Sequence, residues 1–544
     1  MRSTMMTDGL TLDLLVERAE SLFPAVPIVS RAPDRRLVRS SYGEVMARAR
    51  ALAGGLQAEG LQAGDRVASL MWNHQMHLEA YFGVPLAGGV LHTLNPRLSI
   101  DDLVYIIGHG GDRFLIVDAA LLPLYLQLRD QVKLERVWVV RWQDEPLDGA
   151  TLTDYEDLLA TGRGRFMPHQ LDEADPCLMC YTSGTTGRPK GVVYSHRSTV
   201  LHAMAITMPD AVGLSCRDVV TPVVPMFHAN AWGLPFAATL VGAPQVFPGP
   251  HLDAVSLLDL FAGEGVTVTA GVPTIWLGLL EALRQEPERW DLPAMRTVVG
   301  GSAVPAALIE GLAAFGMSVI QGWGMTETSP LAALAQLKPA ENALPPAERL
   351  RYQTSQGLPC PLVRLRIADD AGQALPWDGV RMGEVQVRGP WITAAYHGDE
   401  GADKFTADGW LRTGDVAVVD PKGYVFLTDR TKDLIKSGGE WISSVALENA
   451  LMNHPAVLEA AVIAVPDERW GERPLAVVVF KSGEKASVED LKAHLGAHFA
   501  KWMVPDRYVF ATAIPRTSTG KFNKLALRAQ YRQTAEREGD DGLA

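Results

Sequence analysis

Along the first ~420 residues, segments with the apolar periodicity of a helix alternate with short apolar runs typical of strands. The stretch RLVRSSYGEVMARARALAGGLQAEG predicts a short strand and then a helix that ends at Gly60. DRVASLMW (65–72) and DRFLIVDAAL (112–121) are short apolar runs that predict strands. This alternation is typical of α/β proteins.

Three further apolar runs each break at glycine. They are TVTAGVPTIW (267–276), MRTVVGGSA (295–303) and MSVIQGWGMTE (317–327). In open α/β sheets, ligands bind at loops that follow the carboxyl ends of strands. We therefore expect ligand contacts after each of these runs.

The pattern changes in the last third of the chain. Residues from about 355 to 428 show short strands and turns, which predicts a β-rich subdomain. After it, the pattern predicts a helix over 445–454, strands over 457–466 and 474–482, a helix over 487–500 and a strand over 506–514, followed by a turn and a helix. We predict a large N-terminal domain of α/β layers, residues 1–429, and a small mobile α+β domain, residues 430–544, with a hinge near 429–433.

Length, charge and cysteine content narrow the class of protein. A chain of 544 residues is too long for one ordinary core. A net charge of −13 argues against general binding to nucleic acid or anionic membranes, so an anionic substrate needs a local cationic cluster. No apolar run approaches the ~20 residues of a transmembrane segment. Acidic residues interrupt the first apolar stretch of the chain, so this stretch is predicted to be an amphipathic helix and not a signal peptide. Four cysteines do not form a disulfide framework, which indicates the cytoplasm.

Two of those cysteines, Cys177 and Cys180, form a C-x-x-C motif. Such a pair can be a redox centre, half of a zinc site or two buried structural thiols. There is no second C-x-x-C, and the surrounding CLMCYTS predicts a buried strand on which the two side chains point to opposite faces. The sequence favours buried structural thiols.

The segment YTSGTTGRPKG (181–191) combines small hydroxyls, three glycines and one lysine. Glycines let backbone N–H groups converge on an anion, and hydroxyls add donors, so the composition indicates phosphate binding. The Walker A spacing is absent, which disfavours a generic nucleotide triphosphatase. A flexible surface turn is the alternative.

Together with five later motifs, this segment resembles the adenylate-forming superfamily of acyl-CoA synthetases, beetle luciferases and peptide-synthetase adenylation domains. The motifs are GGSA (300–303), QGWGMTET (321–328), WLRTGD (410–415), DRTKDLIKSGGEWIS (429–443) and PRTSTGKF (515–522). They follow the family's order nearly end to end. PMFHANAWGLPF (225–236) and GGEWIS further resemble the bacterial fatty-acyl-CoA synthetase branch, including relatives that act on methylmercaptopropionate.

The resemblance implies a two-step reaction, in which a carboxylate attacks the α-phosphate of ATP and the thiol of CoA then displaces AMP. Two anions meet in the first step, so cations and donors must neutralise the transition state. Glu327 corresponds to the family's magnesium carboxylate, with Thr182 as a second oxygen, and Thr326 corresponds to a contact of the α-phosphate. Lys521 corresponds to the lysine that reaches both the substrate carboxylate and the α-phosphate.

The resemblance also assigns the nucleotide contacts. Trp323 stands where the family usually has tyrosine, which keeps stacking on adenine but loses the phenol. Asp415 would accept hydrogen bonds from the ribose. The complete set expected around ATP or AMP is Thr182, Ser183, Gly184, Thr185, Thr186, Gly187, Lys190, Gly301, Ser302, Ala303, Gln321, Gly322, Trp323, Gly324, Thr326, Asp415, Arg430, Lys432, Lys436 and Trp441.

Rotation of the C-terminal domain between the two steps would present the CoA-binding stretch Ser437, Gly438 and Gly439 to the pantetheine arm. The expected acyl pocket comprises His228, Asn230, Trp232, Val272, Pro273, Thr274 and Gly324, and His228 is also a candidate catalytic residue. Trp232 corresponds to a tryptophan that gates the acyl tunnel, although a plain core role is the alternative. The pocket set carries no acid for an ammonium group, which favours an aliphatic acid over an amino acid.

We therefore expect an acyl-CoA ligase that uses ATP, CoA and Mg²⁺, with homodimerisation by family analogy. Three alternatives share the motifs or part of them. An adenylate former could load a carrier protein, a luciferase-like oxygenase would differ in its pocket, and a non-catalytic nucleotide-binding protein would lack Glu327, Asp415 or Lys521, all of which are present.

Overall fold

The computed structural model describes residues 3–142, 152–182, 188–438, 440–516 and 522–531. These residues form two compact units. The first holds the described residues up to Arg364 together with Val387–Leu411, and the second holds Leu365–Gln386 and the described residues from Arg412 onward. The proposed boundary at residues 429 and 430 stays a prediction.

A seven-stranded sheet forms one layer of the first unit. Its strands, in spatial order, are β7 (Leu152–Asp154), β6 (Arg136–Val140), β5 (Asp112–Asp118), β3 (Arg66–Leu70), β4 (Val90–Thr93), β8 (Pro176–Tyr181) and β9 (Gly191–Ser195). All neighbours are parallel except β8 and β9, which form an antiparallel hairpin. The predicted strands at 65–72 and 112–121 are confirmed.

A nine-stranded sheet forms the other layer of this unit. Its strands, in spatial order, are β16 (Leu358–Pro359), β15 (Leu331–Leu334), β14 (Met317–Gly324), β13 (Met295–Gly300), β12 (Val268–Gly271), β10 (Val220–Pro222), β11 (Gln245–Phe247), β1 (Pro27–Arg31) and β2 (Leu37–Ser41). Strands β10, β12, β13 and β14 are parallel neighbours, so their carboxyl ends share one edge of the sheet.

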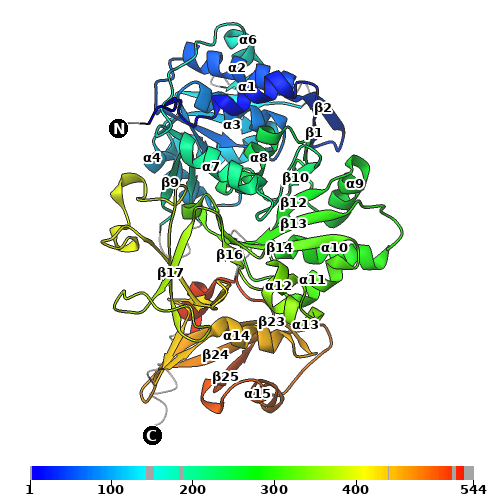
Figure 1. Cartoon of the computed structure of the whole chain (residues 1–544), viewed down its shortest axis with the longest axis vertical. Coiled ribbons are helices and arrows are strands. Elements are labelled where there is room, and N and C mark those ends of the chain that lie inside the picture. Colours follow the sequence, from blue (N-terminus) through cyan, green and yellow to red (C-terminus); the bar gives the residue numbers. More distant parts are fainter. Residues whose placement is uncertain (1–2, 143–151, 183–187, 439, 517–521, 532–544) are drawn as a thin grey trace. The chain divides into compact units, whose positions relative to one another are not determined.

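Helices surround both sheets (Figure 1). They are α1 (Asp13–Leu22), α2 (Tyr42–Ala58), α3 (Gln75–Leu86), α4 (Ile100–Gly110), α5 (Leu122–Leu128), α6 (Tyr155–Gly162), α7 (His196–Thr207), α8 (Leu234–Val241), α9 (Ala254–Glu264), α10 (Pro273–Gln285), α11 (Ala306–Ala313), α12 (Pro339–Asn342) and α13 (Pro346–Gln353). Helix α2 begins where the side chain of Ser41 accepts from the N–H of Glu44. It ends at Ala58, and Gly60, the predicted end, follows with φ +84°. Leu257, Phe261 and Trp276 bury α9 and α10 in one apolar core with β13. No helix within the described ranges is long and apolar enough to cross a membrane.

The second unit contains two smaller sheets. One has the order β17 (Arg364–Ala368), β18 (Met382–Arg388), β19 (Leu411–Val419) and β20 (Val425–Arg430). The other has the order β22 (Glu440–Ile442), β21 (Ile435–Ser437), β24 (Gly471–Phe480) and β23 (Val457–Asp467), with β25 (Arg507–Phe510) beside β24. Helices α14 (Ser444–Met452) and α15 (Val488–Gly496) bury Leu447 and Leu491 against this sheet, which confirms the predicted order of elements.

The C-x-x-C pair lies on β8 with both thiols buried. The Cys177 Sγ is 3.5 Å from the Thr199 Oγ1, and the Cys180 thiol donates to the Asn230 Oδ1 at 3.2 Å. Burial raises the pKa of Cys177 to about 12, so this thiol does not ionise at neutral pH. The prediction that both thiols are buried on a strand is confirmed.

Three buried histidines predict that the first unit loses stability in acid. Burial lowers the pKa of His77 and His202 to about 3 and that of His196 to about 4. Each stays neutral in the folded state at pH 5 while its unfolded form is protonated, so stability present above pH ~6.5 is lost as the pH falls.

Replacing His202 with glutamine tests this prediction. The free energy of unfolding of the wild-type first unit should decrease between pH 7.5 and pH 5 by about 2 kcal/mol more than that of the variant. Denaturant unfolding at the two pH values measures the difference. An equal decrease in both proteins would show that His202 does not carry this pH dependence.

Candidate functional site

The expected ligand-binding segments follow neighbouring parallel strands of the nine-stranded sheet. Gly301 comes directly after β13 with φ +87°, a conformation that favours glycine. Ser302 and Ala303 are exposed beside it. The side chain of Val272, at the start of α10, lies 3.4 Å from the position that a Cβ on Gly301 would occupy. The structure therefore brings together an expected adenine contact and an expected acyl contact.

Strand β14 carries four of the expected nucleotide contacts, Gln321, Gly322, Trp323 and Gly324. The Gln321 Oε1 accepts from the N–H of Val304, which fixes the loop after β13. A Cβ on Gly324 would lie 1.7 Å from the carbonyl oxygen of Pro330, so only glycine fits there. Trp323 is buried, with 7% of its surface exposed. Packing of the strand by itself therefore accounts for the glycine at position 324.

The described ends of the phosphate segment meet each other. The Thr182 N–H donates to the Lys190 carbonyl at 2.9 Å, and the Lys190 N–H donates to the Thr182 Oγ1 at 3.0 Å. The segment is thus the loop of the β8–β9 hairpin. Ser183, Gly184, Thr185, Thr186 and Gly187 lie outside the described residues.

A 3₁₀ turn, η4 (Thr326–Thr328), carries the expected metal carboxylate. The hydroxyl of Tyr194 donates to the Thr326 carbonyl at 2.7 Å, and the Thr393 N–H donates to the Glu327 carbonyl at 2.8 Å. The Tyr396 hydroxyl donates to the Glu327 Oε1 at 2.6 Å. Burial, and then the charge of Glu327, raises the pKa of Tyr396, so its hydroxyl remains a donor. The Glu327 carboxylate is therefore buried, and its position is fixed by the hydrogen bond from Tyr396.

The expected acyl segment has an unusual backbone. Ala229, Asn230, Ala231 and Trp232 all have positive φ, between 40° and 55°, although none is glycine. A left-handed conformation costs roughly 1–2 kcal/mol per residue, so neighbouring contacts must hold it. Asn230 accepts from the Cys180 thiol, and the Trp232 ring lies 3.1 Å from where a Cβ on Gly300 would be. His228 precedes the turn and is half-buried. Pro273 is buried in the first turn of α10, and Thr274 is exposed.

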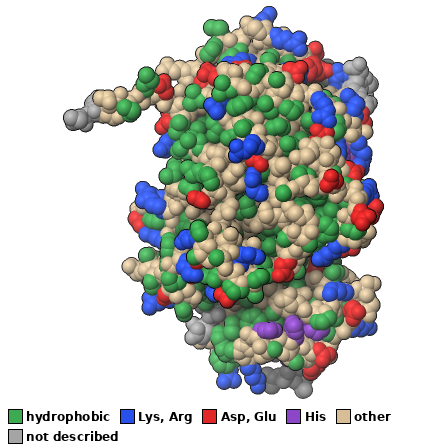
Figure 2. Space-filling view, turned by 45° about the vertical axis from the view of Figure 1, so that its right-hand side comes forward, with side chains coloured by type: hydrophobic (Ala, Val, Ile, Leu, Met, Phe, Trp, Pro, Cys, Tyr) green, Lys and Arg blue, Asp and Glu red, His purple; other side chains and the backbone are tan. Residues whose placement is uncertain are grey.

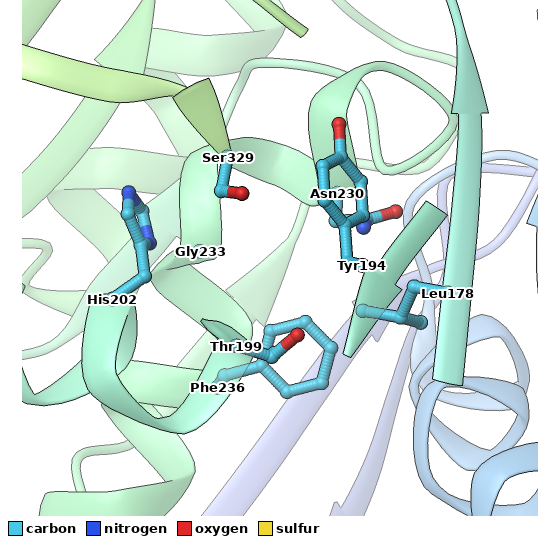
Figure 3. A pocket seen from close by; sticks show the side chains of 8 residues that line it. All are labelled: Leu178, Tyr194, Thr199, His202, Asn230, Gly233, Phe236 and Ser329. Atoms are coloured by element: carbon cyan, nitrogen blue, oxygen red, sulfur yellow. The ribbon is translucent and has the colours of Figure 1, made fainter. Parts of the chain in front are cut away.

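A small pocket adjoins this turn (Figure 3). Its lining consists of Leu178, Tyr194, Thr199, His202, Asn230, Gly233, Phe236 and Ser329. It has room for about one water molecule. An acyl chain therefore needs the surrounding side chains to move before it can enter here.

The second unit holds the remaining residues that are expected to contact the nucleotide. Asp415 and Arg430 are paired on β19 and β20, and the Arg430 Nε lies 3.2 Å from the Asp415 Oδ1. Lys432 is exposed, and the Lys436 Nζ lies 3.9 Å from the Asp370 Oδ2. Lys436 pairs with Trp441 across β21 and β22. Lys521 lies outside the described residues.

The expected CoA-binding stretch follows β21. The Ser437 Oγ accepts from the Arg473 Nη1 at 3.2 Å. Gly438 has φ +61°, and its N–H donates to the Trp470 carbonyl at 2.8 Å. A Cβ on Gly438 would lie 2.7 Å from the Trp470 ring, so glycine permits this approach. Gly439 lies outside the described residues.

Sequence reasoning did not find Tyr396 or Trp470. Trp470 lies in the segment DERWG between two predicted strands, and a tryptophan among polar turn residues is a sequence signal that could have identified it. Tyr396 has no comparable local signal, because its partner Glu327 is 69 residues away in the chain.

Three histidines gather on the surface of the second unit (Figure 2). The rings of His454 and His494 are 5.1 Å apart, and those of His494 and His498 are 5.9 Å apart. His454 and His494 each use one nitrogen for a backbone hydrogen bond. No group of three or more His, Cys, Asp or Glu side chains in the described part of the chain could hold a metal ion.

Known proteins are similar to this chain over nearly its whole length. Residues 18–397 match the family model of AMP-binding enzymes, and residues 446–521 match the model of the AMP-binding enzyme C-terminal domain. The chain is 54% identical over 533 residues to a long-chain-fatty-acid–CoA ligase of Thermus thermophilus, covering 97% of both chains. It is 43% identical to a 3-methylmercaptopropionyl-CoA ligase of Ruegeria lacuscaerulensis, covering 98% of this chain and 99% of that protein.

Solved structures share the fold. The crystal structure of an anthranilate CoA ligase in complex with anthranoyl-AMP has a TM-score of 0.84 and 26% sequence identity. The match covers 98% of this chain and 100% of that one. The similarity therefore extends over both compact units.

Proposed function

The chain belongs to the family of AMP-binding enzymes, and on this basis we propose that it is an AMP-forming acyl-CoA synthetase whose acid is a medium- or long-chain fatty acid. The substrate carboxylate attacks the α-phosphorus of ATP and pyrophosphate leaves. The CoA thiol then attacks the carbonyl of the acyl-adenylate and AMP leaves. The observation that carries the proposal is the 54% identity to a long-chain ligase over nearly the whole chain.

Glu327 and Thr182 would hold Mg²⁺ in the first step. Both offer hard oxygen atoms, and Mg²⁺ is usually bound by one or two protein oxygens with phosphate and water completing its shell. The buried, hydrogen-bonded carboxylate of Glu327 fits this role, because it is already fixed before the ion arrives. Bound Mg²⁺ would neutralise charge that develops on the phosphates.

The other nucleotide contacts follow from charge and shape. The segment between Thr182 and Lys190, whose two ends are joined by a hydrogen bond, would bind the β- and γ-phosphates, since its composition offers hydroxyls, glycines and the cation of Lys190. Asp415 can accept from both ribose hydroxyls, with Arg430 beside it to fix the carboxylate. Lys521 would bridge the substrate carboxylate and the α-phosphate.

Apolar side chains support an aliphatic acid. Val272, Trp232 and Pro273 give the expected pocket no acidic group for an amino acid's ammonium. Methylmercaptopropionate remains the second candidate, because the chain is 43% identical to a ligase named for that acid. From the family resemblance we also propose that the protein is a homodimer and that its C-terminal domain, from residue 430, is mobile. The four free cysteines support a location in the cytoplasm.

A series of acids tests the proposed substrate. AMP release from ATP and Mg²⁺ should be measured for straight-chain acids of increasing length and for methylmercaptopropionate, each with and without CoA. We expect CoA-dependent turnover with an optimum at medium or long chains. An optimum at methylmercaptopropionate would overturn the fatty acid as substrate, and an adenylate that CoA cannot discharge would favour a carrier protein as acceptor.

A further inference from the structure

We propose that Tyr396 is a positioning residue that holds the Glu327 carboxylate and the Lys190 ammonium in the places where magnesium and the ATP phosphates are bound. The inference rests on the proposed function, which assigns Glu327 to the metal and Lys190 to phosphate. It adds a side chain that none of the sequence motifs contains.

The backbone around Tyr396 is fixed against the turn that carries Glu327. After β18 the chain returns to this turn, where the Ser329 Oγ donates to the Trp391 carbonyl at 2.8 Å. The Trp391 Nε1 donates to the Leu331 carbonyl at 3.0 Å, and the Thr393 N–H donates to the Glu327 carbonyl at 2.8 Å. These three hydrogen bonds fix the segment that precedes Tyr396 against the turn that carries Glu327, independently of the Tyr396 side chain.

The hydroxyl of Tyr396 restricts the carboxylate. Its 2.6 Å bond to the Glu327 Oε1 is in the short range of O–H···O⁻ bonds, which are about twice as strong as neutral ones. Glu327 is only 5% exposed, so water screens this bond little. Because Oε1 is held by a donor on a fixed segment, the carboxylate keeps one orientation.

The ring of Tyr396 contacts the lysine. The Lys190 Nζ lies 5.1 Å from the ring centroid, within the range of cation–π attraction. Gly401, with φ +67°, makes room for the ammonium, since a Cβ there would lie 2.6 Å from the Lys190 Nζ. The backbone of Lys190 is anchored on Thr182, so the ring fixes the remaining, flexible part of the side chain.

One tyrosine thus gives a partner to each of two opposite charges. Without it, the Lys190 ammonium loses its cation–π contact and the Glu327 Oε1 loses this hydroxyl donor. The hydroxyl acts on the metal side and the ring acts on the phosphate side. This division predicts that the two effects separate in different variants.

Tyr396→Phe keeps the ring and removes the hydroxyl, whereas Tyr396→Leu removes both. Calorimetric titration with ATP, in the absence of a carboxylic acid, should be carried out with chelator and over a range of Mg²⁺ concentrations. For Tyr396→Phe we expect the affinity for ATP without metal to be unchanged. The Mg²⁺ concentration at which half of the metal-dependent increase in ATP affinity is reached should rise about tenfold. For Tyr396→Leu we expect, in addition, metal-free ATP binding that is weaker by about threefold to tenfold.

Tyr155→Phe is a matched control, because the Tyr155 hydroxyl also donates to a buried glutamate, Glu79, at 2.9 Å outside the proposed site. It should behave as wild type in both titrations. If Tyr396→Phe also matches wild type while Glu327→Gln shifts the Mg²⁺ dependence, the positioning role is wrong and the metal role of Glu327 stands. If neither Tyr396→Phe nor Glu327→Gln shifts the Mg²⁺ dependence, the positioning role of Tyr396 and the metal role of Glu327 are both wrong. The ligase assignment is judged separately, by acyl-CoA formation in the wild type.

Discussion

Replacing Lys521 with alanine should slow acyl-adenylate formation by about 10²–10³-fold, the loss typical of removing one preorganised charge-stabilising group. The substrate carboxylate and the α-phosphate repel each other, and the ammonium of Lys521 would neutralise both at the point of attack. The second step joins a thiol to an adenylate that is already formed and does not need this cation. Acyl-CoA formation from synthetic acyl-adenylate should therefore remain within a few-fold of wild type.

The two half-reactions must be measured separately to test this prediction. Pyrophosphate release in the presence of acid and ATP reports the first step, and acyl-CoA formation from synthetic acyl-adenylate and CoA reports the second. Lys485→Ala, at an exposed lysine of the second unit, serves as the control. Equal losses in both steps for Lys521→Ala would indicate a structural effect and contradict the assigned role.

Replacing Glu327 with glutamine should lower the rate of adenylate formation by about 10²–10³-fold at fixed Mg²⁺. Glutamine has nearly the same volume and can still accept from the Tyr396 hydroxyl, so the turn Thr326–Thr328 should keep its place. What is lost is the negative charge that binds the cation. The loss should become smaller as the Mg²⁺ concentration rises.

Stopped-flow or quench measurements of pyrophosphate release over a range of Mg²⁺ concentrations test this expectation. Glu264→Gln provides a control, since Glu264 is an acid of the same unit that pairs with the exposed Arg39 outside the proposed site. A loss of activity for Glu327→Gln that is independent of Mg²⁺ would argue for a role other than metal binding. Retained wild-type activity would remove Glu327 from the site.

Local sequence patterns were sufficient to predict some of the elements in both units. Helix α2 has its cap at Ser41 and its stop at Gly60, and both signals lie within the segment itself. The same is true of the strands that end at Gly300 and Gly324, where glycine marks a close approach of backbone. These features depend on neighbours in the chain, so periodicity and turn residues reveal them.

Contacts between distant segments could not be predicted in this way. The bond from Tyr396 to Glu327 depends on how the chain returns to the turn after β18, and neither residue alone indicates the other. In the left-handed turn at Ala229–Trp232 only Asn230 is of a type that adopts positive φ readily, so the conformation of the turn depends on tertiary contacts such as Asn230 with Cys180. The candidate site was located by motifs, but its supporting contacts required the fold.

The most direct measurement follows the oxygen atoms of the acid. A fatty acid labelled with heavy oxygen in its carboxylate should be incubated with the enzyme, ATP, Mg²⁺ and CoA, and the products analysed by mass spectrometry. If the carboxylate attacks the α-phosphorus, one labelled oxygen must appear in AMP for each acyl-CoA formed. Label in inorganic phosphate with release of ADP, or no transfer of label, would contradict an acyl-adenylate route.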